Sequence, residues 1–364
     1  MILQIEPWID KNEKKYLDRV VESTFVTEHE LTKEFENRIK KLTGSKHAIA
    51  ITNGTAAIYC CLLSLGIGPG DEVIVPNLTF VATANAVIMT GATPVLCDIS
   101  SVSMCIELEQ IKKVVTDKTK CIIPVHLFGN ASQMNEIIDY AKENKIKIVE
   151  DAAQGVGVKI GNKHVGTFGD LGILSFYGNK TITCGEGGII LTEDDSLAKR
   201  CYQLKNHGRS RKGVFVHETI GFNFSFTEMQ AAIGLSQLDK LDQIVSIKER
   251  IYNRYCNAFT NADICIPERV KNVTSVMWMS FFFFKNRRGL EEHMTSKGIQ
   301  TRKFFYPLHL QPCYKDFPSI VKDSCYDVSI SLFENGLCLP SSVLMTDEDQ
   351  DTVIAEVLNF TESQ

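Results

Sequence analysis

The feature that most constrains the fold is a repeated alternation, from about residue 30 onward, between short apolar runs and helical segments. Runs that are apolar at nearly every position predict strands buried on both faces, which need helices above and below them. Helical crossovers between such strands favour parallel pairing. The sequence therefore predicts an α/β fold with a mostly parallel sheet. The expected strands are 47–52, 72–75, 94–99, 120–125 and 146–150.

The segments between these strands have helical spacing of apolar residues, and the pattern changes after residue 170. Two further strands then enclose a glycine-rich loop, and the remainder predicts a smaller α+β domain. We place the boundary so that a large domain covers 1–245 and a small C-terminal domain covers 246–364. The expected helices are 31–42, 54–65, 81–89, 133–144, 195–205, one or two within 228–254, 290–297 and one from about 346; the later strands are 171–177, 188–192 and 276–284.

Composition excludes several classes of protein. A chain of 364 residues with 44% hydrophobic and 23% charged residues is typical of a globular protein. The net charge of -5 argues against a nucleic-acid surface. The most apolar run, 275–284, is too short to cross a bilayer. No signal-like segment opens the chain, so we expect a cytoplasmic protein without a membrane partner. The twelve scattered cysteines contain no C-x-x-C motif, which favours free buried thiols over disulfides or a metal site.

Polar residues follow several of the expected strands, where ligands collect in open α/β sheets. In 52–57, Gly54 allows close approach of the backbone, and the amides of Thr55 and Ala56 are expected to be free at a helix N-terminus. Such a terminus favours a phosphate. A simple helix cap is the alternative interpretation.

Asp151 follows the strand 146–150 directly. A carboxylate at this place can keep a heterocyclic nitrogen protonated, and a helix-capping role is the alternative. Phe80 lies just past another strand, where it can stack on a flat ring or belong to the core. Lys180 lies in the loop 175–188 between two apolar strands. Burial there would lower the pKa of Lys180 and supply a neutral amine, whereas an exposed turn lysine is the alternative.

With these candidate residues in this combination and order, the chain resembles the nucleotide-sugar aminotransferases of the DegT/DnrJ/StrS type. The resemblance runs through nearly the whole chain, and its C-terminal motif 302–309 and the loop 178–188 are similar to perosamine synthases. It implies the type I aminotransferase fold of pyridoxal-phosphate enzymes, with a seven-stranded sheet in the large domain. The resemblance is densest in 52–57, 68–76, 124–129, 150–154 and 165–170.

The resemblance also implies roles for individual residues. Lys180 would be the catalytic Schiff-base lysine of pyridoxal 5'-phosphate, and Asp151 would be the partner of the pyridine nitrogen. Asn223 would reach the cofactor phosphate of the neighbouring subunit, which implies a homodimer with shared active sites. Glu186 and His309 are candidate sugar-site residues or structural ones. The other expected cofactor-binding residues are Gly54, Thr55, Ala56 and Ser175 for the phosphate, Gln154 beside the ring hydroxyl and Phe80 on the ring face. Ser225 departs from the family, which usually has an arginine there.

The implied reaction transfers an amino group from L-glutamate, through pyridoxamine 5'-phosphate, to a nucleotide-linked 4-keto-6-deoxyhexose. The first choice of nucleotide is GDP, and the first choice of aminated carbon is C4. The product would serve the synthesis of deoxyamino sugars for O-antigen, lipopolysaccharide or another glycan. A dTDP- or UDP-linked substrate, amination at C3 and a non-catalytic regulatory homologue stay open. Lys180 argues against a sugar dehydratase of this fold, which has histidine there. A dinucleotide-binding oxidoreductase is rejected because no glycine motif opens a helix after a strand.

Overall fold

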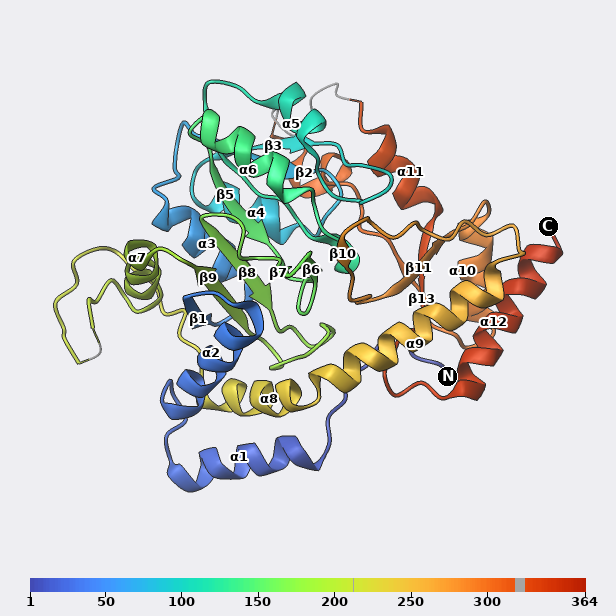
Figure 1. Cartoon of the computed structure of the whole chain (residues 1–364), viewed down its shortest axis with the longest axis horizontal. Helices are drawn as coiled ribbons and strands as arrows, with labels where there is room; N and C mark the ends of the chain where they lie inside the picture. The colour runs from blue at the N-terminus through green and yellow to red at the C-terminus, as the bar shows by residue number, and fades with distance from the viewer. Residues whose placement is uncertain (212, 318–324) are drawn as a thin grey trace.

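The computed structural model describes residues 1–364 except 212 and 318–324. A seven-stranded sheet lies at its centre, in the order β1-β9-β8-β5-β4-β2-β3 (Figure 1). Neighbouring strands are parallel except at β9, which is antiparallel to both β1 and β8. The predicted α/β class and mostly parallel sheet are confirmed. The strands are β1 (His47–Ile51), β2 (Glu72–Pro76), β3 (Thr93–Cys97), β4 (Thr119–Ile122), β5 (Lys147–Asp151), β8 (Leu171–Ser175) and β9 (Gly188–Thr192).

Helices cover both faces of this sheet, as apolar strands require. In β2, Val73 and Val75 face one layer of helices while Ile74 faces the other, because successive side chains point to opposite faces. One layer consists of α3 (Gly54–Ser64), α4 (Ala82–Met89) and α7 (Asp195–Lys205). The other consists of α2 (Glu30–Thr43), α5 (Leu108–Val114), α6 (Met134–Glu143) and α8 (Glu228–Asp239), with α1 (Lys11–Ser23) against α8.

The C-terminal third surrounds a small antiparallel sheet, β11-β13-β12. The long helix α9 leads into it from α8 (Figure 1). The expected domain boundary at 245/246 falls inside α9, and Ile2 at the start of the chain pairs with residues 298–300, so the domain limits stay a prediction. Its elements are α9 (Leu241–Phe259), β11 (Ser280–Phe283), α10 (Arg287–Ser296), β12 (Arg302–Lys303), α11 (Asp327–Asn335), β13 (Gly336–Leu339) and α12 (Asp347–Glu362).

Short elements complete the described structure. A second small sheet joins β10 to β6 and β7, linking the segment before β11 to the central part of the chain. These elements are β6 (Lys159–Ile160), β7 (Lys163–His164), β10 (Val273–Thr274) and the 3-10 turns η1 (Leu127–Gly129), η2 (Leu308–Leu310) and η3 (Pro312–Tyr314). In the described part of the chain, no helix combines the length and apolar character needed to span a membrane.

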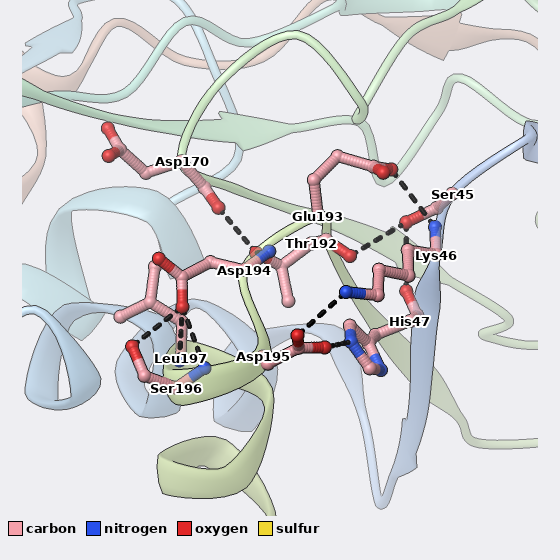
Figure 2. Close-up of polar contacts among 10 residues, drawn as sticks. All are labelled: Ser45, Lys46, His47, Asp170, Thr192, Glu193, Asp194, Asp195, Ser196 and Leu197. Atoms are coloured by element: carbon pink, nitrogen blue, oxygen red, sulfur yellow. Dashed lines mark hydrogen bonds and ion pairs between the residues drawn. The ribbon is translucent and has the colours of Figure 1, made fainter.

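A polar cluster holds the start of β1 against the start of α7 (Figure 2). Asp194 caps α7 by accepting hydrogen bonds from the amides of Ser196 and Leu197. The next carboxylate, Asp195, contacts Lys46 at 2.7 Å and His47 at 2.6 Å. Because His47 opens β1 and Ile51 ends it, this cluster lies at the edge of the sheet opposite the carboxyl ends of the strands.

Two expectations were wrong in detail. The apolar run expected as a strand over 276–284 is buried except for the half-buried Phe283, but only Ser280–Phe283 forms a strand. Before it, the Trp278 carbonyl accepts a hydrogen bond from the Lys248 side chain instead of joining a ladder. The cysteines are also not uniformly buried. Eight of the twelve are buried, Cys256 is half-buried, and Cys265, Cys313 and Cys325 are exposed.

Candidate active site

Segments that follow four strands of the central sheet, β1, β2, β5 and β8, line one cavity of about 560 Å³ at the carboxyl edge of that sheet. Parallel strands end at the same edge, so residues far apart in sequence meet there. Nine of the residues predicted for the site lie in its walls. They are Gly54, Thr55, Ala56, Phe80, Asp151, Gln154, Ser175, Lys180 and Glu186.

The N-terminus of α3 forms one wall of the cavity. Asn53 caps the helix, and its side-chain oxygen accepts a hydrogen bond from the Ala56 amide at 2.9 Å. The expectation that the Ala56 amide is free was therefore wrong. Gly54 and Thr55 are the first two helical residues, so their amides precede the first intrahelical hydrogen bond and remain suited to an anion.

Gly54 allows a close approach between α3 and β8. A Cβ atom at this position would lie 3.2 Å from Cβ and 3.3 Å from Oγ of Ser175. The bare backbone brings the helix N-terminus and the Ser175 hydroxyl to one small space. Amide and hydroxyl donors around a helix N-terminus match the oxygens of a phosphate, so this corner of the cavity fits the phosphate of the expected cofactor.

Asp151 ends β5 and is almost fully buried. Its two oxygens accept hydrogen bonds from Thr83 Oγ1 at 2.8 Å and from the Ala153 amide at 3.1 Å. These bonds orient the carboxylate and leave further lone pairs, since each carboxylate oxygen has two. Gln154 beside it accepts a hydrogen bond from the Phe128 amide at 2.7 Å through its side-chain oxygen. Its NH₂ group remains as a donor. This pair fits a protonated ring nitrogen and a ring oxygen.

Lys180 reaches the same cavity from the loop between β8 and β9. Its Nζ lies 4.2 Å from the centre of the Trp278 ring, and the indole N–H donates to the carbonyl of Asn179 at 2.5 Å. Burial lowers the pKa of Lys180 to about 8, the negative charge of Asp151 opposes this, and the positive charge of Arg302 adds to it. A larger fraction of the amine is therefore neutral near neutral pH than for an ordinary lysine.

Sequence reasoning missed several wall residues, notably Thr83, Trp278, Arg302 and Phe305. Arg302 and Phe305 belong to the motif 302–309, yet nothing in their spacing places them opposite a loop more than a hundred residues earlier. Trp278 lies inside an apolar run that predicts only burial. The contact between Thr83 and Asp151 likewise depends on the tertiary fold.

Two predicted residues lie outside this cavity. Asn223 forms a backbone bridge with Asn206 after α7. His309 donates its backbone amide to Asn77 Oδ1 and has its Nδ1 3.0 Å from the same oxygen. Its ring packs on Tyr326 at 4.6 Å, so His309 is part of a local packing arrangement. Phe80 does line the cavity, but its side chain is 54% exposed.

Comparison with known proteins decides the family. The model of the DegT/DnrJ/EryC1/StrS aminotransferase family matches residues 7–358. The chain belongs to this family. It is therefore an aminotransferase, as the sequence predicted. The chain is 36% identical over 358 residues to the GDP-perosamine synthase of Escherichia coli O157:H7, with 97% of this chain and 96% of the relative covered.

Solved structures of family members have the same fold. An aminotransferase of this family from Brucella abortus superposes with a TM-score of 0.90 at 32% identity, covering 96% of this chain and 95% of its own. The "Putative sugar aminotransferase Spr1654" of Streptococcus pneumoniae, in its PMP form, superposes with a TM-score of 0.92 at 26% identity, covering 99% of this chain and 97% of its own. The predicted type I fold is confirmed, and so is pyridoxal phosphate as the cofactor of this class of enzyme.

Proposed function

We propose that this enzyme transfers an amino group from L-glutamate to C4 of a GDP-linked 4-keto-6-deoxyhexose. One observation supports the chemistry above all: a lysine of lowered pKa, a buried carboxylate and a helix N-terminus share one cavity. The likeness to GDP-perosamine synthases supports the choice of sugar and nucleotide. The product is an amino sugar suited to an O-antigen, lipopolysaccharide or another glycan.

We infer the residues that hold the cofactor from the geometry of the cavity. The amides of Gly54 and Thr55 and the hydroxyl of Ser175 bind the phosphate. Asp151 keeps the ring nitrogen protonated, and Gln154 donates to the ring oxygen. The bound cofactor withdraws electrons from the carbon that loses its proton.

Lys180 is the residue that holds and moves the proton. Its Nζ attaches the cofactor, and after release it takes a proton from the donor's α-carbon and later returns a proton to the sugar carbon. A pKa near 8 suits both tasks, because the protonated and neutral amine are then both populated around neutral pH. Trp278 keeps the amine over its ring between these steps.

We propose a homodimer whose two active sites are shared. The segment between α7 and α8 extends from the molecule (Figure 1) and exposes 81% of Phe215 and 85% of Ile220. Apolar side chains this exposed are suited to burial against a second copy. Asn223 lies near the end of the same segment and outside its own cavity, so we infer that it serves the cavity of the neighbouring subunit.

The shared-site proposal has a direct test. Lys180→Ala and Asn223→Ala variants should each have little activity. When the two are co-expressed, mixed dimers should recover activity, because one of their two cavities combines both native residues. A monomer by light scattering, or no recovery in mixed dimers, would refute the arrangement.

A second function has one specific observation in its favour. The chain is 33% identical over 351 residues to the "Pleiotropic regulatory protein" of Geobacillus stearothermophilus, with 95% of this chain and 93% of that protein covered. A purely regulatory homologue has no need for Lys180 and Asp151 in one cavity, so we favour catalysis. Other members of the family leave dTDP or UDP substrates and C3 amination as alternatives.

The deciding experiment loads the purified enzyme with cofactor and L-glutamate and offers a panel of keto-sugars. The panel contains GDP-, dTDP- and UDP-linked 4-keto-6-deoxyhexoses and their 3-keto isomers. We expect amination of the GDP-linked 4-keto sugar, detected by mass spectrometry and located by NMR, and none with Lys180→Ala. Turnover of another member alone would reassign the substrate, and turnover of none would favour the regulatory homologue.

A further inference from the structure

Arg302 places a positive charge at the junction of two cavities. It lies in β12, where it pairs with Cys338 of β13, and it lines both the main cavity and an adjacent cavity of about 260 Å³. Phe80 and Phe305 also lie in the walls of both. Arg302 therefore lies between the cavity that contains Lys180 and the adjacent cavity.

Two aromatic rings lie beside this guanidinium. Its central carbon lies 5.8 Å from the ring centre of Trp278 and 5.9 Å from that of Phe305. Among the residues that the structure describes, none forms an ion pair or a side-chain hydrogen bond with Arg302. Aromatic faces attract the charge but do not satisfy the five N–H donors in the plane of the group. Those donors match the two oxygens of a carboxylate.

Trp278 relates this cation to the reacting amine. Lys180 Nζ and the Arg302 guanidinium lie 4.2 Å and 5.8 Å from the centre of the same indole ring. In an amino acid the carboxylate is bonded directly to the carbon that loses its proton. A donor whose α-carbon is within reach of Lys180 therefore has that carboxylate only a few ångströms away, and Arg302 is a cation in the wall of the same cavity.

The other anions in the reaction fit Arg302 less well. The cofactor phosphate has its own donors at the N-terminus of α3, and Asp151 is already held by Thr83 and the Ala153 amide. A nucleotide diphosphate is separated from C4 by the sugar ring, so it lies farther from Lys180 than a donor carboxylate does. We propose that Arg302 binds the α-carboxylate of the amino donor, an inference that rests on the proposed transaminase function.

The test measures binding separately from turnover. Isothermal titration calorimetry follows 2-oxoglutarate and GDP binding to the cofactor-loaded enzyme. 2-Oxoglutarate retains the carboxylate but lacks the amine. Arg302→Gln should weaken 2-oxoglutarate binding by about 10- to 100-fold and leave GDP binding unchanged, since a charge-assisted bidentate contact is lost. Arg302→Lys should bind 2-oxoglutarate with an affinity between those of the wild type and Arg302→Gln, because an ammonium offers charge without the planar fork.

Arg269→Gln is the matched control, since Arg269 is a surface arginine that already pairs with Glu249 at 2.6 Å. It should bind both ligands as the wild type does. Circular dichroism and the mass of the cofactor-linked protein verify that each variant folds and holds the cofactor. If Arg302→Gln loses GDP binding instead, Arg302 is a diphosphate ligand and the proposal fails. Unchanged binding of both ligands also overturns it.

Failure of this inference is distinguishable from failure of the proposed function. If the wild type aminates the sugar and Arg302→Gln binds 2-oxoglutarate normally, the donor site is wrong and the function stands. If 2-oxoglutarate binding depends on Arg302 but no sugar is aminated, the donor site stands and the acceptor is wrong.

Discussion

Lys180 and Trp278 form one structural unit, although they are nearly a hundred residues apart. The lysine amine lies over the indole ring at 4.2 Å, and the indole N–H donates to the carbonyl of Asn179, the residue before the lysine. The loop that carries the amine is thereby attached at two points to a residue from the C-terminal third of the chain. The position of the reacting group thus depends on contact between a loop from the middle of the sequence and a segment from its C-terminal third.

Replacing Lys180 by alanine should abolish attachment of the cofactor and all transamination. Borohydride reduction of the wild type should fix the cofactor's mass to the peptide containing residue 180, and the variant should show no such addition. Lys205→Met is an unsuitable control, because that lysine is buried and pairs with Glu28. The exposed Lys285 is suitable, and Lys285→Met should label as the wild type does. A label on another lysine would contradict the assignment.

The lowered pKa of Lys180 predicts how cofactor capture depends on pH. Capture needs the neutral amine, which is formed above a pKa of about 8 rather than 10.5. The rate at which apoenzyme captures pyridoxal phosphate should therefore rise with pH and reach half its maximum near pH 8. Stopped-flow absorbance measures it. A rate that still rises tenfold per pH unit above pH 9 would mean that the amine is not perturbed.

The Arg302 charge gives this pH profile an internal check. The nearby positive charge lowers the pKa of Lys180, so its removal in Arg302→Gln should move the midpoint to higher pH. Removal of the Asp151 charge in Asp151→Asn should move it to lower pH. Shifts in the same direction for both variants would contradict the charge arrangement.

The hydrogen bond from Thr83 to Asp151 predicts a small, specific loss of activity. Thr83→Val removes one donor from the carboxylate and should lower kcat by about 5- to 10-fold, equivalent to about 1 kcal/mol. Thr83→Ser retains the hydroxyl and should retain most of the activity. Asp151→Asn should lower kcat further, by at least about 100-fold, because the ring nitrogen of the cofactor loses its charged partner. Equal activity of Thr83→Val and the wild type would show that the bond does not orient Asp151.

Local sequence predicted the sheet well because its strands are apolar on both faces. β1, β2, β5 and β9 lie within one or two residues of the expected limits. The residues that follow these strands could also be placed, since parallel strands share a carboxyl edge. The residues that surround Lys180 could not be identified from the sequence. In the sequence, Trp278 lies in an apolar run and predicts only a core residue. The structure shows that the backbone before it passes close to Gly129, where a Cβ atom would collide with the Val276 carbonyl.

Lys248 holds this backbone path in place. It is buried in α9, and its Nζ donates to the carbonyls of Trp278 at 3.0 Å and Ser341 at 3.2 Å. Lys248→Met would leave both carbonyls without this donor while removing a buried charge. We therefore expect Trp278 to be less ordered in this variant, and the midpoint pH of cofactor capture by Lys180 to change. Arg250→Met, at an exposed position of α9, should leave this midpoint unaltered.

The pH dependence of stability should separate the buried charge of Lys248 from its hydrogen bonds. Burial lowers its pKa to about 8 from 10.5, so between these values the unfolded chain binds more protons than the folded one. The free energy of unfolding contributed by Lys248 should therefore rise as pH increases from about 8 to 10.5, and lie at its lower limit below pH 8. Urea unfolding of apoenzyme at pH 7 and pH 10 measures it. The wild type should gain on the order of 2 kcal/mol relative to Lys248→Met between these pH values. A difference between the two proteins that is independent of pH would mean that the amine has an ordinary pKa and that its burial does not oppose its charge.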